Sequence, residues 1–218
     1  MVTEATWLAA NNPYAMIRLV AERVSPRKIR LFSVARCRRM WDQITDERCR
    51  NAVMVGERYA DGAADASDLE LADQGLTQSL HEFLGTVDER NEYARLVATC
   101  RTTVLPDESR ATGGNAKMEL AGEWHAFHAR VTSEDAPTVR DIVGNPFRPP
   151  VFDPLWRSET ALALAAGIYA ERAFDRLPIL ADALEDAGCE DTDILGHCRG
   201  PGPHVRGCWV VDLLLGKA

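Results

Sequence analysis

The chain has 218 residues, of which 46% are apolar and 27% are charged, and its formal net charge is −8. These values are those of an ordinary folded protein, so they exclude an intrinsically disordered or a fibrous chain. The length is enough for one or two domains, each with an apolar core.

Neither export nor insertion into a membrane is predicted. The N-terminal residues MVTEATWLAANNPYAM lack a basic region followed by an apolar one, and no apolar run reaches the roughly 18 residues that a membrane helix needs. Six cysteines are scattered along the chain: Cys37, Cys49, Cys100, Cys189, Cys198 and Cys208. Without an export signal they are expected to be reduced thiols, and the protein is expected to be cytoplasmic.

The segment from Arg23 to Arg50 is basic although the protein as a whole is acidic. It holds nine basic residues and three acidic ones. Such a cluster can bind nucleic acid, but in an acidic protein it more often pairs with the protein's own carboxylates. No aromatic RNA-binding motif and no base-reading motif accompanies it, so nucleic-acid association is the weaker interpretation.

Helix-start signals dominate the N-terminal part. Thr3 precedes EATWLAA, Asn12-Pro13 precedes YAMIRLVAERV, and Ser25-Pro26 precedes RKIRLFSVARCRRMWDQI. In each case a side chain that can cap a helix stands before the first turn. In the second and third cases proline follows the cap, at a position where a helix tolerates it. Three helices are therefore predicted here.

The middle of the chain continues the helical pattern. Asp46 is a predicted cap for residues 47–60, and Ser67 for residues 68–84. Further helices are expected over about 88–104 and 115–131. The polar segment between them, residues 105–115, contains Gly113-Gly114 and is expected to be a surface loop.

A proline-rich segment separates this part from the C-terminal part. After a short predicted helix over 137–143, residues 144–156 contain four prolines, which exclude a regular helix and favour extended structure. The aromatic residues of this strap are too apolar for a solvated linker. We therefore expect residues 1–143 to form an N-terminal helical body, across which the strap lies, and residues 157–218 to pack on the same body.

The C-terminal part is again helical in pattern, with helices expected over about 158–173, 174–187, 192–199 and 203–215. No strict alternation of polar and apolar residues indicates a sheet. The prediction is an all-α fold of about ten helices, either a compact multi-helix bundle or an irregular stack of helical pairs.

The chain lacks the common catalytic and phosphate-binding motifs. GxGxxG, GxxxxGK[ST], HExxH, GxSxG and CxxC are all missing from the sequence. Many active sites have no local motif, so this lowers the expectation of an enzyme without excluding one.

The densest group of metal-ligating residues lies near the C-terminus: Cys189, His197, Cys198, His204 and Cys208. If the last helix begins near Pro203, then His204 and Cys208 lie one turn apart on one face, followed by Asp212. Zinc could bind there through histidine and cysteine, although the spacing matches no standard zinc finger. Two other interpretations remain, of which buried packing is favoured and a thiol nucleophile is the weaker.

A second group surrounds His125 and His128, three residues apart, with Glu119 and Glu123 nearby. This spacing is compatible with a shared metal ion, but a half-buried helix face explains it equally simply. Packing is preferred here as well.

The function favoured by the sequence is a non-catalytic helical module that docks a protein partner. The surface expected to carry it combines the strap with the turn at Gly200-Pro-Gly-Pro203, and its candidate residues are Phe147, Phe152, Trp156 and Arg206. A zinc-binding protein and a nucleic-acid-associating protein are the alternatives.

Three segments resemble an uncharacterised paralogous family expanded in planctomycete bacteria. They are RKIRLFSVARCRRMW with DERCRNAVMVGERYADG, DIVGNPFRPP, and ERAFDRLPILADALEDAGCEDTDILGHCRGPGPHVRGCWVVDLLLGK. The resemblance implies a bacterial, intracellular, mostly helical protein and carries no established activity. Related sequences often look richer in cysteine around Cys37, which argues against a metal site there.

Overall fold

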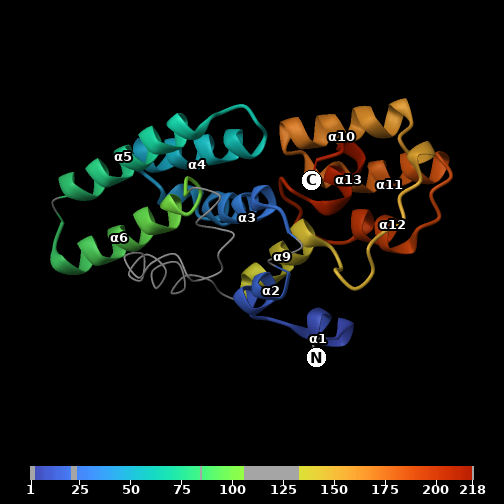
Figure 1. Ribbon diagram of the computed structural model, residues 1–218, viewed down its shortest axis with the longest axis horizontal. Coiled ribbons are helices and arrows are strands. Elements are labelled where there is room, and N and C mark those ends of the chain that lie inside the picture. The colour runs from blue at the N-terminus through green and yellow to red at the C-terminus, as the bar shows by residue number, and fades with distance from the viewer. Residues whose placement is uncertain (1–2, 21–23, 84, 106–132, 218) are drawn as a thin grey trace. The chain divides into compact units, whose positions relative to one another are not determined.

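The computed structural model describes residues 3–20, 24–83, 85–105 and 133–217. Within these ranges the chain forms eleven α-helices and no strand, so the all-α prediction is confirmed (Figure 1). None of the helices in the described part is both long enough and apolar enough to cross a membrane. The predicted helix over 115–131, the histidines at 125 and 128, and residues 106–115 of the predicted loop lie outside the described ranges.

The contacts divide the chain into two units. Unit 1 comprises residues 1–10 and 136–218, and unit 2 comprises residues 11–135. The helices of unit 2 are α2 (Pro13–Val20), α3 (Pro26–Arg39), α4 (Glu47–Ala60), α5 (Ala66–Glu82) and α6 (Val87–Arg101). Those of unit 1 are α1 (Glu4–Ala9), α9 (Ala136–Val143), α10 (Glu159–Glu171), α11 (Leu177–Asp186), α12 (Thr192–Arg199) and α13 (Trp209–Leu215).

This division differs from the predicted one at its boundary. The break expected at residue 144 lies inside unit 1, because α9 packs against α13 and the first ten residues join the same unit. The predicted packing of residues 157–218 on the N-terminal body stays a prediction.

In unit 2, α4 packs against α3, α5 and α6, and the four helices enclose one apolar core (Figure 1). The start of α4 follows from local sequence, because the Asp46 side chain accepts the backbone N–H of Arg48. A Cβ atom on Gly56 would collide with the carbonyl of Thr103, so glycine lets the chain after α6 approach α4 closely.

Two helix limits in unit 2 differ from the prediction. The helix that starts at Pro26 ends at Arg39, and a short 3-10 turn, η1 (Trp41–Gln43), follows it. Asp65, rather than Ser67, caps α5. The Asp65 backbone is extended, its carboxylate accepts the N–H groups of Ser67 and Asp68, and the Asp68 side chain accepts the N–H of Asp65 in return.

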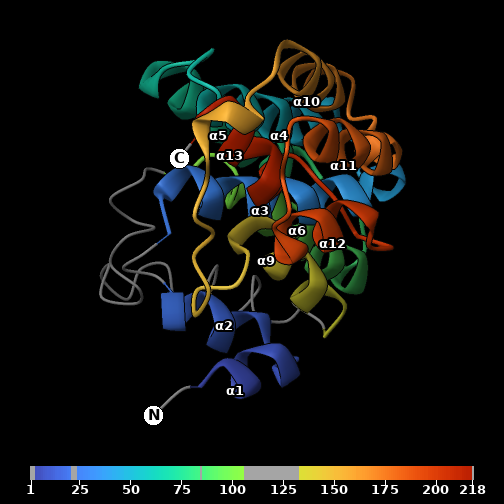
Figure 2. The same ribbon diagram turned by 90° about the vertical axis from the view of Figure 1, so that its right-hand side faces the viewer.

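In unit 1, α11 lies between α10 and α12, as both views show (Figures 1 and 2). Helix α13 packs against α10, and the core of the unit is formed by the apolar faces of α10 to α13. The strap has no helix or strand from residue 144 to residue 153 and then forms a 3-10 turn, η4 (Pro154–Trp156). Phe152 and Trp156 pack against the core, whereas Val151 and Leu155 are 85% and 79% exposed.

The last helix begins later than predicted. Helix α13 starts at Trp209, so His204 lies in the preceding loop and Cys208 is the N-cap residue. The prediction that His204, Cys208 and Asp212 share one helical face was therefore wrong. Gly207 has a φ of +95°, which an α-helix does not allow, so the residues before it lie outside α13. In this loop the backbone N–H of Val205 donates to the Asp141 carboxylate from α9.

Candidate metal centre

Four potential metal ligands converge in unit 1 from four segments. Asp141 lies on α9, His197 in the last turn of α12, His204 in the loop after Gly200, and Cys208 at the start of α13. One ligand atom of each lies within 4.8 Å of those of the other three. Asp141 and Cys208 are buried, and the two imidazoles are partly exposed.

The Asp141 carboxylate is the centre of the group. Its Oδ1 lies 2.7 Å from Nδ1 of His204 and 3.1 Å from Nε2 of His197. Its Oδ2 accepts the backbone N–H of Val205 at 2.9 Å. The two carboxylate oxygens are therefore used differently: Oδ1 faces the histidines and Oδ2 fixes the loop.

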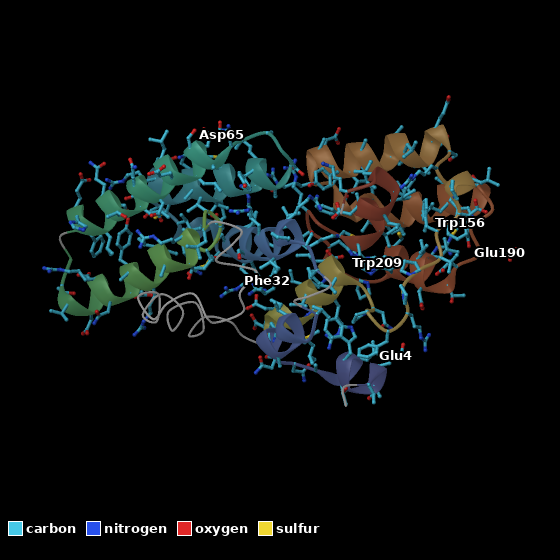
Figure 3. The ribbon with its side chains drawn as sticks, in the orientation of Figure 1. Glu4, Phe32, Asp65, Trp156, Glu190 and Trp209 are labelled. Atoms are coloured by element: carbon cyan, nitrogen blue, oxygen red, sulfur yellow. The ribbon has the colours of Figure 1, made fainter. Side chains whose placement is uncertain are left out.

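The histidine rings are oriented by their other neighbours. Nε2 of His204 lies 3.3 Å from the carbonyl oxygen of Gly200, to which it can donate. Nε2 of His197 lies 3.2 Å from Sγ of Cys208, and the His197 ring is 5.2 Å from the indole of Trp209, labelled in Figure 3. The two imidazoles meet edge to face, 4.8 Å between centroids.

Burial and charge act in opposite directions on Asp141 and His204. Burial raises the pKa of Asp141, but hydrogen bonds and charge from His197 and His204 outweigh it, so the pKa falls below the ordinary value. Burial lowers the pKa of His204, yet the hydrogen bond and charge of Asp141 raise it above the ordinary value. Both shifts favour an ionised Asp141 beside a protonated His204 when no cation is bound.

The group does not have the geometry of a thiol nucleophile. Cys208 is fully buried, and burial raises the pKa of its thiol well above the ordinary value. Moreover, the same nitrogen of His197, Nε2, faces both the thiol and Asp141. A catalytic triad uses the two ring nitrogens separately, one for the nucleophile and one for the carboxylate. The weaker sequence interpretation, a cysteine nucleophile, is not supported by this arrangement.

Three of the five predicted metal ligands belong to the group, and two do not. His197, His204 and Cys208 are brought together, whereas Cys189 and Cys198 are buried elsewhere in the core of unit 1. Burial raises the pKa of the Cys198 thiol to about 12. These two cysteines fit the packing interpretation, as small apolar residues.

Asp141 was missed by the sequence analysis. It lies 63 residues before His204, and no spacing rule connects a residue in a short helix with a loop so far along the chain. One signal was available, because Asp141 opens the segment DIVGNPFRPP, which carries part of the family resemblance.

The predicted interaction residues have mixed surroundings. Phe147 is 38% exposed, while the rings of Phe152 and Trp156 meet edge to face at 5.5 Å. The Arg206 guanidinium donates to the carbonyl oxygens of Tyr169 and Ala170 and lies over the Tyr169 ring. Arg206 therefore caps carbonyl groups at the C-terminal end of α10, in addition to any role at the surface.

The described arginines of the basic segment bind groups within their own unit. Arg38 pairs with Glu57, Arg39 with Asp135, and Arg48 with both Asp46 and Glu82. Arg30 is fully buried and donates to two backbone carbonyls. This is the internal pairing that the sequence analysis preferred to a nucleic-acid surface.

The resemblance to the planctomycete family stays a prediction from the sequence. No protein-family profile, no curated protein and no solved structure matches the chain.

Proposed function

We propose that the protein binds a divalent transition-metal ion, most suitably Zn²⁺, through Asp141 Oδ1, His197 Nε2, His204 Nδ1 and Cys208 Sγ. The observation that carries the proposal is the convergence of one ligand atom from each of these four residues within 4.8 Å, although the residues come from four separate segments. Packing alone does not require donor atoms of four side chains to face one point.

Three distances between ligand atoms are near those of a tetrahedral site, and all ligand atoms lie within 4.8 Å of one another. Zinc bonds of about 2.0 to 2.3 Å place neighbouring ligand atoms about 3.3 to 3.6 Å apart. His197 Nε2 lies 3.1 Å from Asp141 Oδ1 and 3.2 Å from Cys208 Sγ, so these pairs need little adjustment. The 2.7 Å pair of Asp141 and His204 must lengthen by about 0.6 Å to reach the lower limit.

The donor types and charges suit zinc better than magnesium or calcium. Two imidazole nitrogens and a thiolate are typical ligands of Zn²⁺, whereas Mg²⁺ and Ca²⁺ prefer sets of oxygen atoms. An ionised Asp141 and a Cys208 thiolate together supply two negative charges, which neutralise a divalent cation. A bound cation also removes the cost of burying the thiolate, because metal binding displaces the thiol proton.

Neighbouring backbone groups support ligation. The carbonyl of Gly200 can accept the Nε2 proton of His204, which leaves Nδ1 for the metal. The Val205 N–H holds the second oxygen of Asp141, which leaves the first oxygen as a single donor. Outer hydrogen bonds of this kind orient ligands in zinc proteins.

The role proposed for the metal is structural. Four protein ligands complete a tetrahedral shell and leave no position for a substrate or for water, which is typical of structural rather than catalytic zinc. The ion would join α9, α12, the loop after Gly200 and the start of α13.

Metal analysis tests this proposal. Protein without a histidine tag should contain about one zinc ion per chain, measured by inductively coupled plasma mass spectrometry. Removal of the zinc with a chelator should lower the melting temperature of the protein. His204→Ala and Cys208→Ser should abolish stoichiometric zinc. Cys198→Ser is the matched control, because Cys198 is equally buried in the same unit yet outside the group, and it should retain the metal. Wild-type protein that binds no zinc under these conditions would refute the proposal.

A docking role for the strap is the second candidate. Val151 and Leu155 are large apolar residues that are 85% and 79% exposed, next to Phe152 and Trp156, which pack against the core. Contiguous exposed apolar surface is typical of protein contacts. A partner protein retained by the wild type should be lost with a Val151→Ser, Leu155→Ser variant. Equal retention by both proteins would remove this candidate.

A further inference from the structure

Two neighbouring residues on α9 hold different parts of unit 1. Asp141 faces the candidate metal centre, as described above. Arg140, the preceding residue, donates through one terminal guanidinium nitrogen to the carbonyl oxygens of Trp7, Leu8 and Ala10 at 3.2, 2.9 and 2.5 Å. These carbonyls are at the C-terminal end of α1, where the last helix carbonyls lack the usual partner four residues ahead, although that of Trp7 also accepts the N–H of Ala10.

The turn after α9 holds the other end of α1. Asn145 Nδ2 donates to Oε1 of Glu4 at 2.7 Å, and Nε of Arg148 lies 2.6 Å from the same oxygen. Glu4, labelled in Figure 3, is the first residue of α1. Residues 140–148 thus bind both ends of this helix.

Helix α1 depends on these contacts for its stability. It has only six residues, and isolated helices shorter than about 12 residues are marginal in water. Its one large buried side chain is Trp7, which is 1% exposed. The docked state of α1 therefore depends on the conformation of residues 140–148.

We infer that metal binding at Asp141 and the docking of α1 by Arg140 are coupled, so that the metal stabilises the docked N-terminal helix and Arg140 positions Asp141 for the metal. The inference rests on the proposed function. A cation that fixes Asp141 restricts α9, and restricting α9 fixes the guanidinium that binds α1. Coupling between two sites is reciprocal, so releasing α1 lowers the affinity for the metal by the same factor.

Hydrogen exchange of residues 3–10 tests the first direction. The Trp7 amide donates to the Thr3 carbonyl at 3.0 Å, and its exchange reports the opening of α1. If opening requires loss of the metal, free zinc at 100 times its dissociation constant slows exchange about 100-fold. If α1 opens while the metal stays bound, zinc leaves the rate unchanged, and the inference is overturned.

The zinc affinity of variants tests the reverse direction. Arg140→Ala should weaken zinc binding about 5- to 150-fold, and Arg140→Lys should restore part of the affinity because it keeps a cationic donor. Glu4→Gln should weaken the docking of α1 less than Arg140→Ala does, so a smaller loss of zinc affinity is expected. Glu4 also lies on a different segment from every proposed ligand. Arg176→Ala is the control, because the Arg176 side chain forms an exposed ion pair with Glu171, and the zinc affinity of this variant should match that of the wild type.

The outcomes separate the inference from the proposed function. Stoichiometric zinc with unchanged exchange of residues 3–10, or with wild-type affinity in both Arg140→Ala and Glu4→Gln, overturns the coupling and leaves the metal site standing. Absence of zinc from the wild type overturns both. If the Arg140→Ala variant loses its helical circular-dichroism signal, it is unfolded and its zinc affinity tests nothing. The zinc affinity of Glu4→Gln and the hydrogen exchange of the wild type then test the coupling.

Discussion

A Cβ atom on Gly144 would lie 3.1 Å from Cγ of Trp209, so the indole at the start of α13 covers the residue that follows α9. Gly144 has a φ of +74°, and its N–H donates to the Arg140 carbonyl at 2.8 Å. Both the backbone conformation and the close approach of the ring favour glycine here.

Gly144→Ala should therefore destabilise the protein. A left-handed conformation costs a residue with a Cβ about 1 to 2 kcal/mol, and the contact with Trp209 adds to this cost. We expect a loss of about 2 to 3 kcal/mol in the free energy of unfolding, measured by urea denaturation. Gly167→Ala is the matched control: Gly167 lies inside α10, a Cβ atom added to it would meet nothing within 4 Å, and alanine there should stabilise by up to about 1 kcal/mol. Equal effects at the two glycines would contradict the explanation.

Asp46 should give the protein a component of stability that disappears in acid. Its pKa lies well below the ordinary value: the hydrogen bond from Arg48 is the largest cause, burial opposes it, and the hydroxyls of Ser79 and Tyr93 lower it further. A carboxylate with a lowered pKa in the folded state stabilises the protein above its ordinary pKa of about 3.9 and loses this contribution as pH falls through the folded pKa.

The variant Asp46→Asn measures this contribution. It should cost about 1 to 3 kcal/mol at pH 7, since hydrogen bonds to a charged group are lost. The difference from the wild type should shrink as the pH of the urea titration is lowered from about 6 to about 2. A difference that stays constant over this range would show that the charge of Asp46 is not its cause.

The six cysteines should be unreactive while the protein is folded. All of them are buried and reduced. Burial raises the pKa of Cys189, of Cys198 and of Cys208, so little thiolate is available there to attack a disulfide reagent in neutral solution. The hydrogen bond with Cys100 lowers the pKa of Cys49, but this thiol is fully buried and is shielded from the reagent by the core. Ellman's reagent should detect no thiol in the native protein and six after unfolding in guanidinium chloride with chelator. Rapid reaction of any native thiol would show that part of a core opens readily.

Local capping explains why much of the fold was predictable. Thr3, Ser25 and Asp46 each accept a backbone N–H in the first turn of the helix that follows them, and this device depends on residues within one turn. The predicted starts of α1, α3 and α4 were therefore correct. Such signals carry no information about contacts between distant segments.

The candidate site depended on those distant contacts. Pro203 favoured a helix start, but Gly207 has a φ of +95° and interrupts the helix. In the loop before it, Val205 N–H and His204 contact the Asp141 carboxylate. Two histidines and a cysteine could be proposed because they lie close in sequence. Asp141 could not, because its partners become visible only when α9 packs beside α13. The ligands meet in this loop, and its position beside α9 depends on contacts between segments that are distant in the sequence.

Arg30 should be one of the most costly residues of unit 2 to replace. It is fully buried on α3, and its terminal nitrogens donate to the carbonyl oxygens of Thr103 at 2.5 Å and Leu105 at 2.8 Å, just after the end of α6. Arg30→Met keeps a long apolar stem but leaves both carbonyls without this donor. Because an unsatisfied buried polar group costs about 1 to 3 kcal/mol, the variant should lose about 2 to 4 kcal/mol of unfolding free energy. Arg95→Met, at an exposed position of α6, should stay within about 0.5 kcal/mol of the wild type. A similar small change for Arg30→Met would mean that water or another donor replaces the guanidinium, and that α3 and the end of α6 are held together by their apolar contacts alone.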